Sequence, residues 1–377
     1  MSRTTMFCAI ALSICNGAAH AAEVGYYSQP ALFGDQIVFV SEGDLWTATL
    51  GDSESGPIIA YRLTSSDGSE SHPCFSPDGR MLAFTAEYDG NRDVYLMPID
   101  GGSPTRLTFH PDPDVALGWT PDGRQVLFRS QRTNPLGRWE LWRIYAQGGM
   151  PIRYEFGECS MASLSSTGRQ IAFTRWSNEN WTWKRYRGGT APEIWIGDLT
   201  AETFTNITDN RANDLFPMWV LGRLYFLSDR TGTTNIFSDS PRGGDLKQHT
   251  AFTPQPDNPT AVEGYDIRWP SADAQRRGTR IAFCQAGGLA LFDAVNETVR
   301  RLDVRLASDR VAKRQRFAEL IETATEYALS PDGTRLLVGS RGELLSLPVK
   351  SGPAVQFTRT SAGGNGAPHI SAKIRWS

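Results

Sequence analysis

Six short strand-forming runs along this chain each follow a tight turn, and three of those turns share almost the same phrase. The phrase is Ser-Pro-Asp-Gly or Thr-Pro-Asp-Gly followed by an apolar run, and its copies occupy residues 75–84, 119–128 and 329–338. Looser copies occupy residues 164–173, 219–226 and 278–283. A unit repeated roughly every 45–55 residues cannot bury its own apolar face, so it must stack on its neighbours.

Besides this turn, the units share a second strand, a Gly-Gly turn and a closing strand. A second strand begins with an acidic or amide residue, at residues 93–97, 140–144, 193–197 and 235–238. A Gly-Gly turn and a closing strand ending in threonine follow, as at Gly101-Gly102 and residues 104–108. These parts make a four-stranded blade, and radial repetition of blades leaves few sheet edges exposed. The first blade lacks the Asp-Gly phrase but keeps the other parts. The chain is therefore predicted to be all-β, a six-bladed β-propeller of four-stranded antiparallel blades at residues 22–305.

The composition of the chain changes after the sixth blade. Residues 306–326 contain neither glycine nor proline and crowd five charged residues between 309 and 316. We interpret this segment as a connector whose basic run is a solvated face. The repeat restarts at Tyr327, so residues 327–377 are predicted to be the first blade of an incomplete second propeller.

The N-terminus is typical of an export signal. Arg3 precedes an apolar run at residues 6–15, and Ala19-His-Ala21 matches a small-residue cleavage site. Residues 1–21 are predicted to be a signal peptide, which implies a secreted or periplasmic protein. Removal of the signal leaves three cysteines, an odd number in three different blades, so buried thiols are expected rather than a disulfide framework.

Bulk properties and motif searches narrow the function. The chain has 38 basic and 41 acidic residues, a net charge of −3. It therefore lacks the excess of basic residues that is typical of a nucleic-acid-binding protein. No run of 18 apolar residues predicts a membrane-spanning helix. G-x-S-x-G, paired CxxC, H-E-x-x-H and phosphate-binding glycine motifs are missing. We therefore expect no catalytic residue, no metal site and no cofactor in this chain.

Two local clusters have structural as well as functional interpretations. Ser71-His72 contains the residue types of a nucleophile and its base. Adjacent residues on a strand point to opposite faces, so the two side chains would not meet, and we interpret this dipeptide as part of a blade-entry loop. An insertion between two strands of one blade contains Trp176, Trp181, Trp183 and Tyr186 among basic residues. It is either an interface for a protein or peptide or an insert packed on its own neighbours.

The repeated phrase resembles the WD40-like propellers of TolB and of tricorn protease. The opening, residues 27–46, is more specific and looks like the start of tricorn-type proteases, and the restart at residues 327–333 resembles that family's passage to a seven-bladed propeller. The resemblance implies a serine peptidase whose nucleophile, base and PDZ-like module lie C-terminal to both propellers. This chain would then be the non-catalytic portion that gates or guides peptides or unfolded polypeptide to the peptidase domain, either as a monomer or in a homo-oligomer.

The resemblance also implies that basic side chains of the first propeller hold the C-terminal carboxylate of a peptide. Arg129 and Arg132, in the sequence Phe128-Arg-Ser-Gln-Arg132, are the candidates here. An arginine suits this role because its planar fork donates two parallel hydrogen bonds to a carboxylate.

Two other interpretations remain open on the sequence alone. One is a TolB-like periplasmic propeller that acts as a protein-binding scaffold. The other is the propeller cap of a prolyl-oligopeptidase-type hydrolase, which would continue into an α/β-hydrolase domain.

Overall fold

The computed structural model describes residues 24–358 except 52–55, 178, 180–183, 256, 259–260, 276, 309–323 and 341–342. The predicted signal peptide lies outside the described residues. Apart from one short 3-10 helix, η1 (Val262–Gly264), the described elements are strands. None of the described helical structure has the length and apolarity to cross a membrane. The chain divides into two compact units, Met1–Asp309 and Arg310–Ser377.

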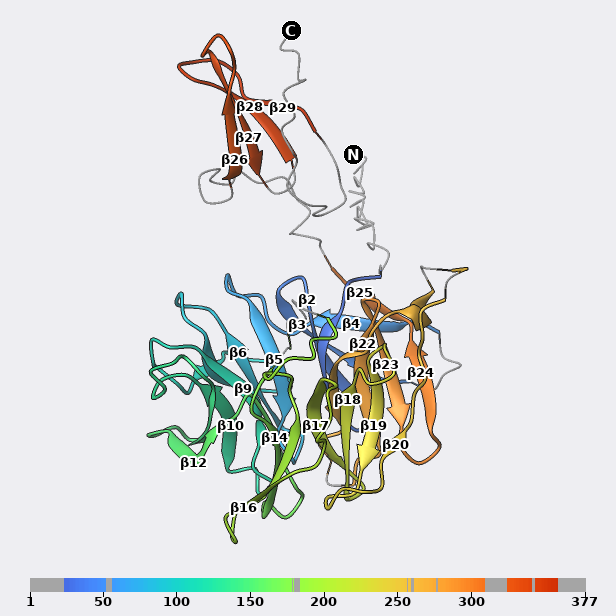
Figure 1. Ribbon diagram of the computed structural model, residues 1–377. Helices are drawn as coiled ribbons and strands as arrows, with labels where there is room; N and C mark the ends of the chain where they lie inside the picture. The colour runs from blue at the N-terminus through green and yellow to red at the C-terminus, as the bar shows by residue number, and fades with distance from the viewer. Residues whose placement is uncertain are drawn as a thin grey trace, which may run out of the picture. The chain divides into compact units, whose positions relative to one another are not determined.

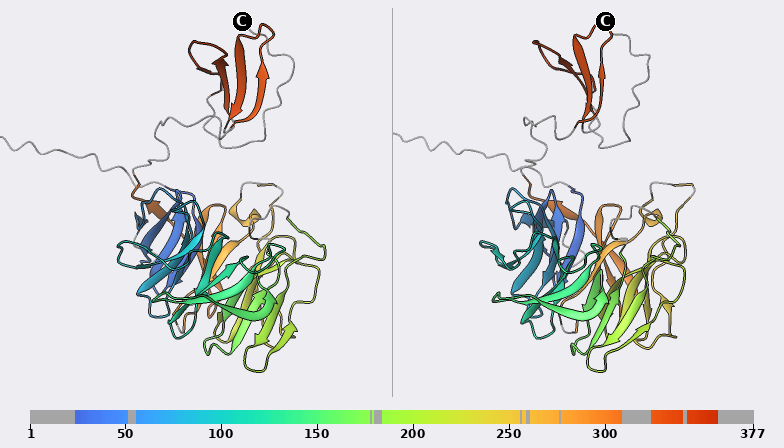
Figure 2. Two further views of the ribbon diagram at one scale, coloured as in Figure 1. Left: turned by 90° about the vertical axis from the view of Figure 1, so that its left-hand side faces the viewer. Right: turned by 60° about the vertical axis from the view of Figure 1, so that its left-hand side comes forward.

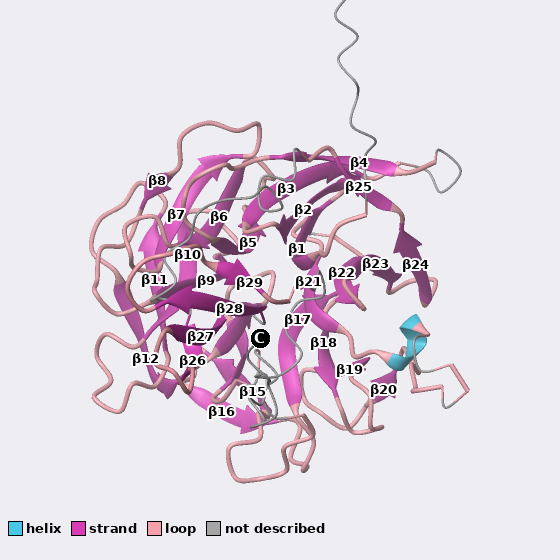
Figure 3. Ribbon diagram, turned by 90° about the horizontal axis from the view of Figure 1, so that it is seen from above, coloured by secondary structure: helices cyan, strands magenta, loops and turns pink. Residues whose placement is uncertain are grey.

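Unit 1 is a ring of six sheets, each built on four consecutive antiparallel strands (Figures 1 and 3). Blades 1 and 2 contain β1 (Ser28–Phe33), β2 (Gln36–Ser41), β3 (Asp44–Thr49), β4 (Ile58–Arg62), β5 (Glu70–Phe75), β6 (Met81–Ala86), β7 (Asp93–Pro98) and β8 (Thr105–Arg106). Blades 3 and 4 contain β9 (Asp114–Trp119), β10 (Gln125–Ser130), β11 (Glu140–Tyr145), β12 (Ile152–Glu158), β13 (Met161–Leu164), β14 (Gln170–Thr174), β15 (Ile194–Asp198) and β16 (Thr203–Asn206). Blades 5 and 6 contain β17 (Asp214–Val220), β18 (Arg223–Ser228), β19 (Asn235–Asp239), β20 (Lys247–Gln248), β21 (Arg268–Ala272), β22 (Arg280–Gln285), β23 (Gly288–Asp293) and β24 (Thr298–Leu302). The predicted six-bladed propeller is confirmed.

Unit 2 is one further four-stranded antiparallel sheet, made of β26 (Ala324–Leu329), β27 (Arg335–Ser340), β28 (Glu343–Pro348) and β29 (Val355–Gln356). Most of the predicted connector lies outside the described residues. Its first residue, Leu306, is the last residue of β25 (Val304–Leu306) in unit 1, and its last three residues, 324–326, begin β26 of unit 2.

The repeated turn is held by side-chain hydrogen bonds that its phrase specifies. In blade 2, the Ser76 hydroxyl donates to Asp78 (2.6 Å) and accepts from the backbone N–H of Met81 (3.0 Å). Gly79 has a φ of 72°, and a Cβ atom there would lie 2.3 Å from the Phe33 ring of blade 1. The turn therefore needs glycine both for its backbone conformation and for the close approach of the neighbouring blade.

An acid or amide residue and a threonine form a second device that recurs in more than one blade. In blade 2, the Thr108 hydroxyl accepts from the backbone N–H of Val94 (3.0 Å) and donates to buried Asp93 (3.2 Å). In blade 5, Thr250 makes the same two contacts with Ile236 and Asn235, both at 2.9 Å. These bonds satisfy backbone groups where the short fourth strand ends, which is why an acid or amide and a threonine recur together.

The core of unit 1 is divided among the blade interfaces. Six clusters of buried apolar side chains lie one between each pair of adjacent blades. β25 adds to blade 1 in parallel with β4 and contributes Val304 and Leu306 to the cluster between blades 6 and 1. The last residues of unit 1 thus fasten the end of the ring to its beginning (Figure 2).

Candidate functional site in the central channel

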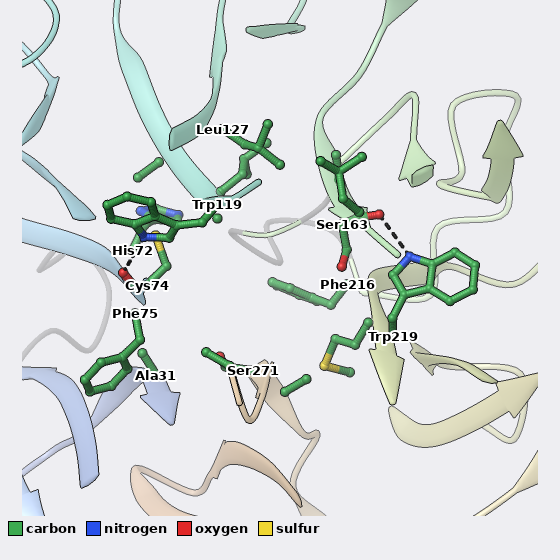
Figure 4. Close-up of a pocket in the computed structure, with 18 of the residues that line it drawn as sticks. Ala31, His72, Cys74, Phe75, Trp119, Leu127, Ser163, Phe216, Trp219 and Ser271 are labelled. Carbon is green, nitrogen blue, oxygen red and sulfur yellow. Dashed lines mark hydrogen bonds between the residues drawn. The ribbon is translucent and has the colours of Figure 1, made fainter. Parts of the chain in front are cut away.

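The innermost strands of the six blades line a central channel of about 720 Å³. Each blade presents the first of its four strands to this channel, which is why residues far apart in sequence meet there. Most of the wall is apolar or aromatic. Trp119 donates its indole N–H to the Cys74 carbonyl of the preceding blade (3.1 Å), and Trp219 donates to the Ser163 carbonyl (3.0 Å). These two bonds join neighbouring blades and fix the indoles at the wall (Figure 4).

Four residues of the channel wall have left-handed backbones. Each lies in an innermost strand at a break in strand register, and each precedes a proline. Their φ angles are between 46° and 54°, and they are Gln29, His72, Phe216 and Trp269. A non-glycine residue in this conformation is strained, and proline restricts it further. All four line the channel, and Figure 4 shows the Phe216 ring extending into it.

A charged cluster lies among these channel-lining residues. The Glu179 carboxylate lies 2.6 Å from His72 Nε2 and 2.6 Å from Arg129 Nη2. Arg129 also donates to the Ser160 carbonyl (2.8 Å), and its guanidinium lies 4.8 Å from the centre of the Trp139 ring. Burial alone would raise the pKa of Glu179, but the charges of His72 and Arg129 outweigh it and hold that pKa well below its usual range.

The structure separates the two predicted arginines. Arg129 is 6% exposed and lines the channel. Arg132 is not among the channel-lining residues; it pairs with buried Asp114 and donates to the Ser130 hydroxyl (3.1 Å). Arg230 in blade 5 repeats this arrangement with Asp214 (3.0 Å) and Ser228 (2.8 Å). Because the same contacts recur in another blade, Arg132 belongs to the framework of its blade.

The aromatic insertion is packed on its neighbours where it is described. The Trp176 ring contacts the guanidinium groups of Arg138 and Arg175, at 4.7 and 5.9 Å from its centre. Lys184 pairs with Asp266 (2.5 Å), and Arg187 pairs with Asp229 (2.9 Å). Trp181 and Trp183 lie outside the described residues. Among described residues, no group of three or more metal-ligating side chains is brought together.

A family model described as the tricorn protease N-terminal β-propeller domain matches residues 24–298. The chain belongs to this family. A tricorn protease homolog of Saccharolobus solfataricus is 30% identical over 336 residues, covering 88% of this chain and 29% of that protein. A putative tricorn-like protease N-terminal subunit of Sulfurisphaera tokodaii is 32% identical over 178 residues, covering 46% of this chain and 86% of that protein.

Similarity in structure agrees with this assignment. The crystal structure of the tricorn protease matches with a TM-score of 0.71 and 23% identity, over 89% of this chain and 31% of that one. This match supports the fold. Because the chain spans less than a third of the tricorn protease homolog of S. solfataricus and of the solved tricorn chain, the activity of a whole tricorn protease does not transfer to it directly.

The sequence prediction missed two of the three residues of the charged cluster in this tricorn-type channel. His72 was expected in an entry loop, yet its ring lies in the channel against Glu179. One signal in the sequence marks the position: a proline follows the channel-facing residue at 29–30, 72–73, 216–217 and 269–270. Glu179 has no such signal, because it reaches the channel from the insertion between β14 and β15.

Proposed function

We propose that this chain is the non-catalytic propeller portion of a tricorn-like serine protease and that its channel binds peptides on their way to or from the peptidase domain. The observation that supports it most is a buried arginine, Arg129, in a channel whose wall combines many apolar and aromatic residues with His72 and three carboxylates, Asp122, Glu179 and Asp273. A free peptide has one end that is always anionic, and Arg129 is the proposed contact for that carboxylate.

The dimensions and chemistry of the channel suit such a ligand. Small-molecule sites are concave, mostly apolar and about 300–1,000 Å³ in volume, with a few polar groups that fix orientation. The channel of about 720 Å³ has these properties. Indole and phenyl faces bind side chains of many kinds, so the wall favours peptides as a class over one sequence.

A blocked channel tests the proposal. Ser271 is a small side chain of β21 that faces the channel (Figure 4), and Ser271→Trp would fill the space in front of it. We expect fluorescein-labelled hexapeptides to bind the wild-type chain and to lose binding in S271W, measured by fluorescence anisotropy. The matched control is Ser103→Trp at an exposed position between β7 and β8. Equal binding by S271W and wild type, or no binding by wild type, would refute the channel as the site.

We also propose that the protein is exported and that signal cleavage leaves Ala22 as its first residue. The basic residue, the apolar run and the Ala-x-Ala site at residues 1–21 support this. N-terminal sequencing of protein from the periplasmic fraction should begin near Ala22. Recovery of chains that retain Met1 in the cytoplasm would contradict it.

A further inference from the structure

The three members of the charged cluster come from three different blades. His72 lies on β5 of blade 2, Arg129 on β10 of blade 3, and Glu179 on the connection between β14 and β15 of blade 4. Glu179 bridges the two basic side chains with one oxygen to each. An acidic side chain from the protein thus occupies the place where an arginine and a histidine converge.

The Arg129 side chain and the backbone of His72 are held in place by contacts other than Glu179. Arg129 is anchored by the Ser160 carbonyl and by the face of Trp139. The backbone N–H of His72 donates to Gln29 Oε1 (2.7 Å) at a break in register, and the imidazole itself pairs with Glu179. Arg129 therefore keeps its position for an anion without Glu179, and His72 adds a second contact from a backbone that is fixed in the same way.

This site has more hydrogen-bonding capacity than Glu179 uses. Arg129 Nε and His72 Nδ1 are buried and have no hydrogen-bond partner among the described residues. A carboxylate has about four lone-pair sites and binds a guanidinium best through two parallel bonds, whereas Glu179 contacts only one nitrogen of Arg129. A buried donor without a partner is unfavourable, so the site favours a carboxylate that engages it more fully.

We propose that Glu179 is an internal competitor: its carboxylate fills the anion site of the channel, and the C-terminal carboxylate of a bound peptide must take its place. This inference rests on the proposed peptide-binding function and adds a regulatory element to the same site. Competition lowers the affinity for free-acid peptides and leaves the affinity for peptides without a terminal carboxylate unchanged. A peptide stays bound only if its side chains also engage the apolar wall.

The test compares two hexapeptides of one sequence, a free acid and a C-terminal amide. They are titrated against the wild-type protein (residues 22–377), Glu179→Ala and Glu179→Gln by isothermal calorimetry. We expect the free acid to bind E179A about 10-fold or more tightly than wild type, because the competing contact is a charge-assisted bond. The amide should change less than about twofold. The matched control is Glu158→Ala, which removes a carboxylate paired with Arg138 and Arg175 that does not line the channel.

Two further comparisons keep the outcomes distinct. A purely structural ion pair would lower the melting temperature of E179A without changing the ratio of acid to amide affinity, and that result overturns the inference. If E179A does not fold, the nearly isosteric E179Q decides, with a gain for the free acid expected. Adding Arg129→Lys to E179Q should abolish that gain. If the amide binds every variant and the free acid gains nothing, only this inference fails, whereas no binding of either peptide refutes the proposed function itself.

Discussion

Glu70 should make the propeller less stable above neutral pH than below it. This first residue of β5 is 2% exposed and accepts hydrogen bonds from Tyr88 (2.7 Å) and Thr64 (3.0 Å). Burial raises the pKa of Glu70 from 4.5 to about 7, and the nearby charge of Asp44 adds to the increase. The folded protein therefore holds a proton that the unfolded chain has already lost between these two values.

The sign and size of the effect follow from this shift. Below pH 4.5 Glu70 is protonated in both states and imposes no penalty. Between pH 4.5 and 7 the unfolded chain binds fewer protons, so stability falls as pH rises, and above 7 the loss is constant. A displacement of about 2.5 pKa units corresponds to about 3 kcal/mol, at about 1.4 kcal/mol per unit.

Glu70→Gln imitates the protonated side chain at every pH, so it isolates the loss of stability that ionisation of Glu70 causes. We expect E70Q and wild type to unfold with similar free energies at pH 4.5 and to differ by about 3 kcal/mol at pH 8, with E70Q the more stable. Urea unfolding followed by tryptophan fluorescence measures the difference. Glu87→Gln, at an exposed carboxylate of the same blade, is the control and should follow wild type. A difference that does not grow with pH would refute the reasoning.

Two other predictions concern the framework. Arg132→Ala should destabilise unit 1 by about 3–5 kcal/mol, because it leaves Asp114, a fully buried carboxylate, without its ion-pair partner; a urea midpoint equal to that of wild type would remove Arg132 from the framework. Leu306→Ala should destabilise unit 1 by about 2–5 kcal/mol, because it leaves a cavity where β25 closes the ring. The same change at Leu337 in unit 2 should leave the unit 1 transition in place, and equal effects of the two substitutions would contradict the role of β25.

The repeated phrases predicted the fold because each phrase has a local physical task. Ser76, Asp78 and Gly79 build one turn, and the Thr108–Asp93 pair ends one blade, so the same residues recur wherever the same geometry does. Arg132 could have been assigned to the framework in the same way. Phe-x-Ser-x-Arg occurs at residues 128–132 and again at 226–230, and a pattern shared by two blades indicates structure.

The site was harder to predict because it depends on contacts between blades. His72 faces the channel since a break in register interrupts the alternation of side chains along β5. Glu179 lies 107 residues from His72 in sequence, in an insertion without periodicity, so only the closed ring brings them together. β25 has three residues and no shared phrase, and its pairing with β4 likewise depends on the ring.

The location of a bound peptide tests the central claim most directly. A hexapeptide with a free C-terminus and benzoylphenylalanine at its penultimate position would be bound to the wild-type chain, irradiated, and its attachment sites mapped by mass spectrometry. The account predicts crosslinks near the charged cluster, in the innermost strands β5, β9 and β13. Crosslinks confined to the outer strands β8, β12 and β16 would show that peptides bind outside the channel and would contradict the account.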